Sequence, residues 1–200
     1  MQIYTFQLGQ LETNCYIVTD EQTKRCAVVD PGASGDKVAD WLQKEGLTPK
    51  FILLTHGHFD HVGGVKALMA RYPGLPVYLH PDDKDMPPKL RGDLFWTDFY
   101  EEGDELLLDS ITIRVLHTPG HTEGSVCLLA GNAMLSGDTL FAGSCGRVDF
   151  EGGSWEKMME SMKRLASLDK NYQVFPGHGE ATTLDHERAS NPYMKEAEKR

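Results

Sequence analysis

Short apolar runs alternate with stretches of helical periodicity along this 200-residue chain. Runs rich in β-branched and aromatic residues predict strands at residues 15–19, 26–30, 51–55, 76–80, 105–108, 111–116, 125–130, 133–136 and 172–175. Some neighbours, such as 105–108 and 111–116, are close enough to form a hairpin. Strands mixed with helices in this way predict an α/β (α+β) fold, in which helices cover a mixed sheet system.

Apolar positions at helical spacing predict the helices between these strands. One helix covers residues 35–45 and ends at Gly46, because glycine is a usual helix terminator. A second helix, over residues 64–71, begins at a pair of glycines. A third covers residues 154–168 behind Ser154 as its N-cap, and its methionines are expected to pack in the core.

Two further segments are less regular. Near the end of the chain, Asn191 can cap a helix that has Pro192 in its first turn. Residues 81–104 are rich in proline and aspartate, and we expect a loop with a short helix there. This segment either overhangs a functional site or is a packed surface excursion.

Length and composition predict a single domain over residues 1–200. Hydrophobic residues make up 40% of the chain and charged residues 25%, and no repeat or linker divides it. No apolar run approaches the roughly eighteen residues that a membrane span needs. The start, "MQIYTFQLGQ", lacks the basic and apolar segments of a signal peptide. We therefore expect a cytoplasmic protein with no membrane partner.

Charge and cysteine content exclude other classes of protein. The net charge is −10 and the basic residues are dispersed, whereas a nucleic-acid-binding protein needs a basic patch. The four cysteines are widely separated and form no CxxC pair: Cys15, Cys26, Cys127 and Cys145. We expect reduced, mostly buried thiols rather than a disulfide framework or a cysteine-rich metal site.

The stretch "FILLTHGHFDHVGG", residues 51–64, carries the densest chemistry in the chain. In an extended chain after the strand, His56, His58 and Asp60 project to one side. His61 breaks this rhythm, so a bend is expected there. Clustered imidazoles and carboxylates are costly to bury alone, and they are the groups that bind zinc or iron. The stretch therefore predicts a metal site.

Three downstream residues can complete such a site. His121 in "HTPGHTEGS", Asp138 in "LSGDTLF" and His178 in "FPGHGEA" each lie beside glycine after a β-rich run. Each alone is more typical of turn chemistry, but together with the upstream cluster they indicate shared ligation. The other three histidines are expected to be ordinary loop or surface residues: His80, His117 and His186.

Four motifs in this order, "THGHFDH", "HTPGHTEGS", "SGDTLF" and "PGHG", resemble those of metallo-β-lactamase-fold hydrolases, and the resemblance runs from about Asn14 to Pro192. Within that superfamily, "GDTLFAGSCGR" and "PGHG" are most similar to hydroxyacylglutathione hydrolases, also called glyoxalase II, in their short single-domain form. The resemblance implies a four-layer αβ/βα sandwich with the site at one edge.

The resemblance also implies a ligand set for two divalent ions, expected to be zinc, with iron or manganese as alternatives. Three histidines would hold one ion: His56, His58 and His121. One aspartate and two histidines would hold the second: Asp60, His61 and His178. Asp138 would bridge both ions. Asp30, in "VVDPG", matches a family aspartate that orients ligands; an aspartate that simply begins a turn before Pro-Gly is the competing interpretation.

Two ions about 3.5–4 Å apart lower the pKa of a shared water from about 15.7 to about 7, giving a hydroxide that can attack a carbonyl. Asp60 would orient this nucleophile. A thiolate leaves without a proton donor and an amide does not, so we expect a small-molecule thioester such as S-D-lactoylglutathione as substrate. Arg147 falls where the family has a basic residue that contacts the glutathione carboxylate, but Asp149 falls where it has a tyrosine.

Other activities remain open at this point. "GRVDF", residues 146–150, also resembles persulfide dioxygenases, which would use one iron held by His56, His121 and Asp138. Another esterase, lactonase or β-lactamase activity is a further alternative. A non-enzymatic metal-binding scaffold is disfavoured, because such a protein is expected to lose ligands and all seven are present. No oligomeric state is predicted.

Overall fold

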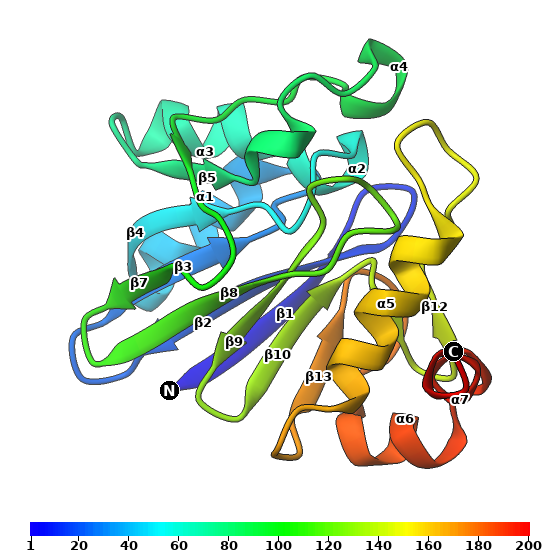
Figure 1. Cartoon of the computed structure of the whole chain (residues 1–200). Coiled ribbons are helices and arrows are strands. Elements are labelled where there is room, and N and C mark those ends of the chain that lie inside the picture. Colours follow the sequence, from blue (N-terminus) through cyan, green and yellow to red (C-terminus); the bar gives the residue numbers. More distant parts are fainter.

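Two six-stranded β-sheets lie face to face between layers of helices in the computed structural model, which describes residues 1–200 (Figure 1). The first sheet follows the order of the chain: β1 (Gln2–Leu8), β2 (Thr13–Asp20), β3 (Arg25–Val29), β4 (Thr48–Leu53), β5 (Val77–Leu79) and β6 (Asp98–Phe99). The second sheet has a crossed order: β14 (Thr182–Thr183), β13 (Gln173–Pro176), β10 (Ala133–Gly137), β9 (Val126–Ala130), β8 (Ile111–His117) and β7 (Glu105–Leu108). A separate ribbon consists of β11 (Leu140–Phe141) and β12 (Ser144–Cys145).

Helices cover the outer face of each sheet. The first sheet packs against α1 (Gly35–Glu45) and α3 (Val65–Arg71). The second sheet packs against three helices: α5 (Trp155–Ala166), α6 (Leu184–Ser190) and α7 (Pro192–Glu198). Three short turns lie outside these layers: α2 (Phe59–Val62), η1 (Pro81–Asp83) and α4 (Pro88–Arg91). The predicted four-layer αβ/βα sandwich is therefore confirmed.

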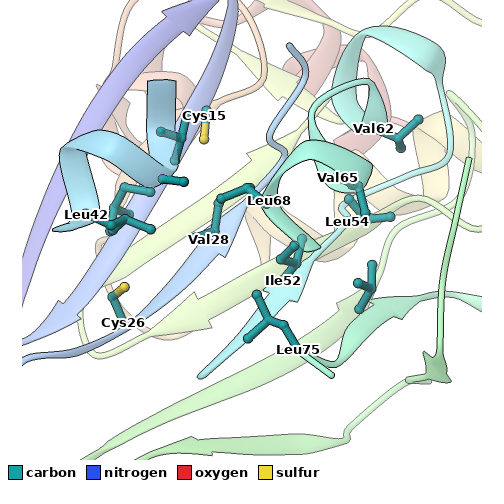
Figure 2. Packing of buried hydrophobic residues seen from close by; sticks show 14 of the residues in the cluster. Cys15, Cys26, Val28, Leu42, Ile52, Leu54, Val62, Val65, Leu68 and Leu75 are labelled. Atoms are coloured by element: carbon teal, nitrogen blue, oxygen red, sulfur yellow. The ribbon is translucent and has the colours of Figure 1, made fainter. Parts of the chain in front are cut away.

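The buried core forms three layers, because each sheet contributes side chains to both of its faces. Along β3, Cys26 and Val28 face the helices while Ala27 and Val29 face the second sheet. Figure 2 shows the outer cluster, in which Leu42 and other helix residues meet strand residues such as Ile52. Burying one such side chain stabilises the fold by about 1.5–3 kcal/mol.

Most predicted elements are confirmed, with small shifts at their ends. All nine β-rich runs contain strands, and residues 105–108 and 111–117 pair as the expected hairpin. Helix α1 has the predicted bounds and ends at Gly46, whose φ of 68° is left-handed. Ser154 caps α5 by accepting a hydrogen bond from the Lys157 amide. Asn191 likewise caps α7.

Several elements were not predicted. Strand β1 pairs with β2 along its whole length, and Tyr4 and Phe6 of β1 contact the ring of Trp41 at 4.8 Å and 4.9 Å between centroids. The irregular segment 81–104 contains two short helices and the edge strand β6, so it is part of the first sheet as well as a loop. Cys15, Cys26 and Cys127 are buried and Cys145 is half-buried, all as free thiols, as expected. None of the helices combines the length and apolar character that crossing a bilayer needs.

Strand direction brings several loops to one edge of the sandwich. In the first sheet β3, β4 and β5 are parallel. In the second sheet β8 and β10 are both antiparallel to β9, and β13 is parallel to β10, so these three strands share one direction. The loops that follow parallel strands of one sheet lie at the same edge of that sheet. The candidate ligands all follow such strands: they lie after β4 in the first sheet and after β8, β10 and β13 in the second.

Candidate metal centre

The first cluster is built on the turn between β4 and α2. The chain is extended at His58, which has φ −68° and ψ 146°, and helix α2 begins at the next residue. Asp60 and His61 therefore lie on a helix, and the His61 amide donates to the His58 carbonyl at 2.9 Å. The predicted extended run through Asp60 is wrong, because the bend comes two residues before His61 rather than at it.

Three histidines from the two sheets form one group. His56 and His58 follow β4, and His121 follows β8. Nδ1 of His58 lies 2.9 Å from Nε2 of His121. The ring centroid of His56 is 4.8 Å from that of His58 and 4.7 Å from that of His121. The three rings are buried, so residues 63 or more apart in the chain share one desolvated site.

A second group combines Asp60, His61 and His178. Oδ2 of Asp60 lies 3.2 Å from Nε2 of His178 and 3.6 Å from Nε2 of His61. His61 is fully buried, whereas the side chains of Asp60 and His178 are 15% and 29% exposed. The second group is therefore the side of the cluster that solvent and ligands can reach.

Asp138 lies between the two groups. Its Oδ1 is 3.4 Å from Nε2 of His61. Its Oδ2 is 3.4 Å from Nε2 of His121 and 3.6 Å from Nε2 of His178. One carboxylate thus contacts histidines of both groups, and the structure brings all seven predicted ligands together.

The seven side chains fit divalent metal ions. Four of their polar atoms are buried without a hydrogen-bond partner: Nε2 of His56, His58 and His61, and Oδ1 of Asp138. Such atoms are almost always paired in proteins. His58 faces His121 with Nδ1 and not Nε2, so the three that call for a shared partner are Nε2 of His56, Nε2 of His61 and Oδ1 of Asp138. Two atoms that each lie about 2.1 Å from a tetrahedral ion are roughly 3.4 Å apart, and the separations here run from 2.9 Å to 3.6 Å. Imidazole and carboxylate suit zinc, iron or manganese.

Hydrogen bonds from outside the cluster orient three of the histidine rings. Nδ1 of His121 contacts the Arg147 carbonyl at 2.7 Å, and Nδ1 of His178 contacts the Leu11 carbonyl at 3.1 Å. Because a carbonyl only accepts, each of these rings carries its proton on Nδ1. His61 has a carboxylate partner at the same atom. In the neutral form of each ring, the form that ligates metals, Nε2 keeps the lone pair and points it into the cluster.

Asp30 is the carboxylate that holds His61. It accepts hydrogen bonds from the Thr55 amide at 2.8 Å and the Thr55 hydroxyl at 2.6 Å. Its Oδ2 lies 2.9 Å from Nδ1 of His61. Asp30 has φ 49°, a left-handed conformation that is costly for a residue with a Cβ. The structure thus places Asp30 beside the cluster, in contact with a predicted ligand and not only in a turn.

Burial and neighbouring charges shift the pKa values of the cluster in opposite directions. Burial and the neighbouring His61 hold the pKa of His56 well below its usual value, and burial and His121 lower that of His58 to about 3. Burial alone would lower the pKa of His61, but Asp138 and Asp30 raise it to about 9. Burial would raise the pKa of Asp60, yet hydrogen bonding to His178 holds it well below its usual range. His56 and His58 therefore offer neutral imidazoles at neutral pH, the form that ligates metals.

The predicted substrate residue Arg147 lies beside the cluster but is not free. Its guanidinium makes two hydrogen bonds of 2.7 Å to Asp149 and lies 3.8 Å from the centroid of the Phe150 ring. Phe150 is exposed, and its ring centroid is 5.9 Å from that of His58. Asp149, which departs from the family pattern, thus binds the one basic group proposed to contact substrate.

Several supporting residues were not predicted. The Thr13 hydroxyl donates to Oδ2 of Asp60 at 3.0 Å. Nδ2 of the Asn14 side chain donates to the Pro176 and Gly179 carbonyls at 2.9 Å each and holds the turn that carries His178. A Cβ at Gly177 would overlap Oδ1 of Asp138, which accounts for the glycine before His178. The glycines beside the ligands could be recognised in the sequence as marks of close packing. The roles of Thr13 and Asn14 in β2 could be found only from the fold.

The remaining histidines lie outside the cluster, but only His186 is the surface residue that the sequence predicts, because His80 is buried and His117 is the last residue of β8. His186 is exposed on α6. His80 is buried and stacks on His117 with centroids 4.1 Å apart and planes 13° apart, and Asp82 lies beside them. Because the lone pairs of stacked, parallel rings do not converge on one point, this trio is a poor metal site in the geometry observed.

A sandwich that gathers histidines and aspartates around buried, unpaired ligand atoms defines a class of metal-binding hydrolases. The chain belongs to the Metallo-beta-lactamase superfamily, whose family model matches residues 8–178. It is 37% identical to an uncharacterised protein, ML0493, of Mycobacterium leprae (98% of this chain, 99% of that protein). It is 31% identical to hydroxyacylglutathione hydrolase GloC of Haemophilus influenzae (97% of this chain, 98% of that protein).

Solved structures support the same family. The BLEG-1 B3 metallo-β-lactamase is similar with a TM-score of 0.88 and 32% identity, over 96% of this chain and 99% of that one. TTHA1623 in a di-iron-bound form has a TM-score of 0.83 and 38% identity, over 95% and 99%. ETHE1 from Myxococcus xanthus has a TM-score of 0.81 and 26% identity, over 96% and 84%. The shared fold and cluster indicate divalent metal ions, and the donor set admits zinc or iron.

Proposed function

We propose that this protein is a two-metal hydrolase of thioesters, with a glutathione thioester such as S-D-lactoylglutathione as the substrate to be tested first. The observation that carries the proposal is the position of Asp138, whose two oxygens contact histidines of both groups. A single ion held by His56, His121 and Asp138 would also use this carboxylate, so the contacts that favour two ions are those of Asp138 with His61 and His178. The similarity to GloC supports the choice of substrate.

The residues of the chain divide the work at this site. When bound, two divalent ions lower the pKa of a shared water and polarise a carbonyl. Asp60 is ionised, since its pKa is held well below the usual range by hydrogen bonding to His178 despite burial. Its Oδ2 already accepts from Thr13, so the carboxylate is oriented. The partly exposed carboxylate of Asp60 can accept a hydrogen bond from the attacking water and so align it.

The surroundings of the cluster favour a thioester over an amide. A thiolate whose parent thiol has a pKa of about 8.5 leaves without protonation, whereas an amide nitrogen needs an acid. The groups that contact the ligands are the carbonyls of Leu11 and Arg147, the hydroxyls of Thr13 and Thr55, and the acceptor Asp30. None of them is placed as a proton donor to a leaving group.

Metal analysis combined with substrate assays tests the proposal. We expect about two ions per chain and hydrolysis of S-D-lactoylglutathione by the purified protein. Asp138→Ala should lose metal and activity together, because it removes the only carboxylate between the two groups. Asp93→Ala is the matched control, since Asp93 is exposed and pairs only with Lys66. Full activity in Asp138→Ala would contradict the bridging role.

A persulfide dioxygenase is the second candidate, supported by the "GRVDF" segment and by the similarity to ETHE1. One iron per chain and oxygen uptake with glutathione persulfide would replace the hydrolase proposal. The complete second group of Asp60, His61 and His178 argues for two ions instead. Because the chain is similar to the BLEG-1 B3 metallo-β-lactamase, a cephalosporin should be assayed alongside S-D-lactoylglutathione and glutathione persulfide.

A further inference from the structure

Asp83 is a buried carboxylate that makes hydrogen bonds to neighbours of the candidate ligands but to none of the seven ligands themselves. It is the last residue of η1, the short turn that follows β5, and its exposed fraction is 1%. Its Oδ2 accepts hydrogen bonds from the Gly57 amide at 2.8 Å and the Thr122 hydroxyl at 2.9 Å. Its Oδ1 accepts from the Gly124 amide at 2.8 Å. One side chain thus holds two separate loops.

These two loops carry the three histidines of the first group. Gly57 lies between His56 and His58, in the loop that leaves the first sheet. Thr122 follows His121 directly, in the loop that leaves the second sheet. The distance of 2.9 Å between Nδ1 of His58 and Nε2 of His121 spans this junction between sheets. Because Asp83 accepts hydrogen bonds from both loops, it is placed to fix the distance between these two histidines.

The second loop approaches Asp83 so closely that it needs glycine at the contact. A Cβ at Gly124 would lie 2.7 Å from Cγ of Asp83 and 2.9 Å from its backbone nitrogen. Gly124 has no positive φ, so close approach and not backbone conformation explains the residue type. At Gly57 a Cβ would lie 3.4 Å from Cβ of Asp83, an ordinary contact.

A charge buried in this way is costly unless it is fully paired. Burial raises the pKa of Asp83 even though the hydrogen bonds from Gly57, Gly124 and Thr122 oppose the shift. An apolar residue could pack at this position without that cost. The arrangement therefore points to a role in geometry, since two oxygens can hold two loops at a fixed separation.

We propose that Asp83 is a positioning residue that clamps the loops of His56–His58 and His121 together and so sets the affinity of the first metal group. The inference rests on the proposed function only for the presence of two ions. The Asp60, His61 and His178 group depends less on the clamp, because Asp83 makes no hydrogen bond to the turn that carries His178. Asp60 and His61 lie on α2, beyond Gly57, and have their own partners in Thr13 and Asp30. Loss of the clamp should weaken one ion and spare the other.

Zinc binding in two half-site backgrounds tests this selectivity. His178→Ala disables the second group and isolates the first, and His58→Ala does the reverse. Adding Asp83→Asn to the His178→Ala protein should weaken zinc binding about 10- to 100-fold, the range found when groups that orient ligands are removed. Adding it to His58→Ala should change zinc affinity less than about twofold. Equal effects in both backgrounds would show a general structural role and overturn the proposal.

Asparagine is the informative substitution because it keeps the size of the side chain. Its single carbonyl oxygen can accept from Gly57 or from Gly124, and its NH₂ group then faces the other amide donor. One arm of the clamp is lost while the volume is unchanged. The matched control is Asp85→Asn, since Asp85 is exposed on the same segment and pairs only with Lys84.

Amide exchange in the metal-free protein gives a readout that does not depend on zinc. Exchange at Gly57 or Gly124 should be at least tenfold faster in Asp83→Asn than in Asp85→Asn. Unchanged protection at both amides would contradict the clamp, whatever the catalytic activity proves to be. If Asp83→Asn does not fold, Gly124→Ala displaces the same carboxylate and should show the same selective loss of zinc. Retention of both ions in these variants would refute the inference and leave the hydrolase proposal standing.

Discussion

Replacing Asp30 by asparagine is expected to weaken the second metal ion through the proton position on His61. In the structure both oxygens of Asp30 accept: one from the Thr55 amide, the other from the Thr55 hydroxyl and Nδ1 of His61. Asparagine has one carbonyl oxygen and one NH₂ group. If the oxygen stays on the Thr55 amide, the NH₂ group faces Nδ1 of His61 and two donors meet.

Relief of that contact requires His61 to move its proton from Nδ1 to Nε2. Nε2 is the atom that faces Asp60 and Asp138, and it has no lone pair once protonated. The reversed amide places NH₂ against the Thr55 amide, which is also a donor, so neither orientation avoids the conflict. We expect zinc affinity at the second group to fall about 10- to 100-fold, which corresponds to about 1.4–2.7 kcal/mol.

Chelator competition with zinc measures the affinity, and thermal unfolding of the metal-free protein measures stability separately. The control is Asp20→Asn, because Asp20 is also buried and accepts from Ser110 and Gln22. It is the last residue of β2, and the turn that follows it carries no ligand. Both variants should lower stability, but only Asp30→Asn should lose zinc. An Asp30→Asn protein that binds two ions with wild-type affinity would refute the tautomer argument.

Two further predictions concern the substrate and pH. Arg147→Ala should raise KM for S-D-lactoylglutathione and Asp149→Asn, which frees the guanidinium, should lower it, each by up to about fivefold for an exposed pair; an unchanged KM in both would show that Arg147 does not bind substrate. Burial and His117 lower the pKa of His80 from 6.5 to about 4. Between these two pH values the unfolded chain therefore binds a proton at His80 and the folded chain does not. Stability should therefore fall between pH 6.5 and 4, and His80→Asn, which keeps an acceptor for the Asp82 amide, should flatten that fall in metal-free thermal unfolding. Identical pH profiles for both proteins would contradict the shift.

Much of the secondary structure could be predicted because its signals are local. Helix α1 stops at Gly46, since glycine takes the left-handed φ of 68° without a Cβ penalty. The β-rich runs become strands because their side chains alternate between two buried layers, as along β3. The sequence pattern does not predict strand β1, because none of its seven residues is fully buried. Pairing with β2 along its whole length places it in the sheet.

The identity of the seven candidate ligands was also available from sequence, because metal chemistry restricts residue type and glycines mark where the chain approaches closely. The local conformation was not. The expected extended run through Asp60 failed because α2 begins after His58, and four residues are too few for a reliable helical pattern. Asp83 was not recognised at all, since an aspartate in a segment rich in proline and aspartate is indistinguishable from turn chemistry.

By itself the sequence determined which side chains are available and which short segments are strands or helices. The tertiary structure alone decided which of those side chains meet. His58 and His121 lie 63 positions apart, and the distance of 2.9 Å between them depends on the order and direction of strands in two different sheets. That order results from burying both faces of each sheet, a property of the whole chain, so the clamp by Asp83 and the ring orientation set by Asp30 became visible only in the fold.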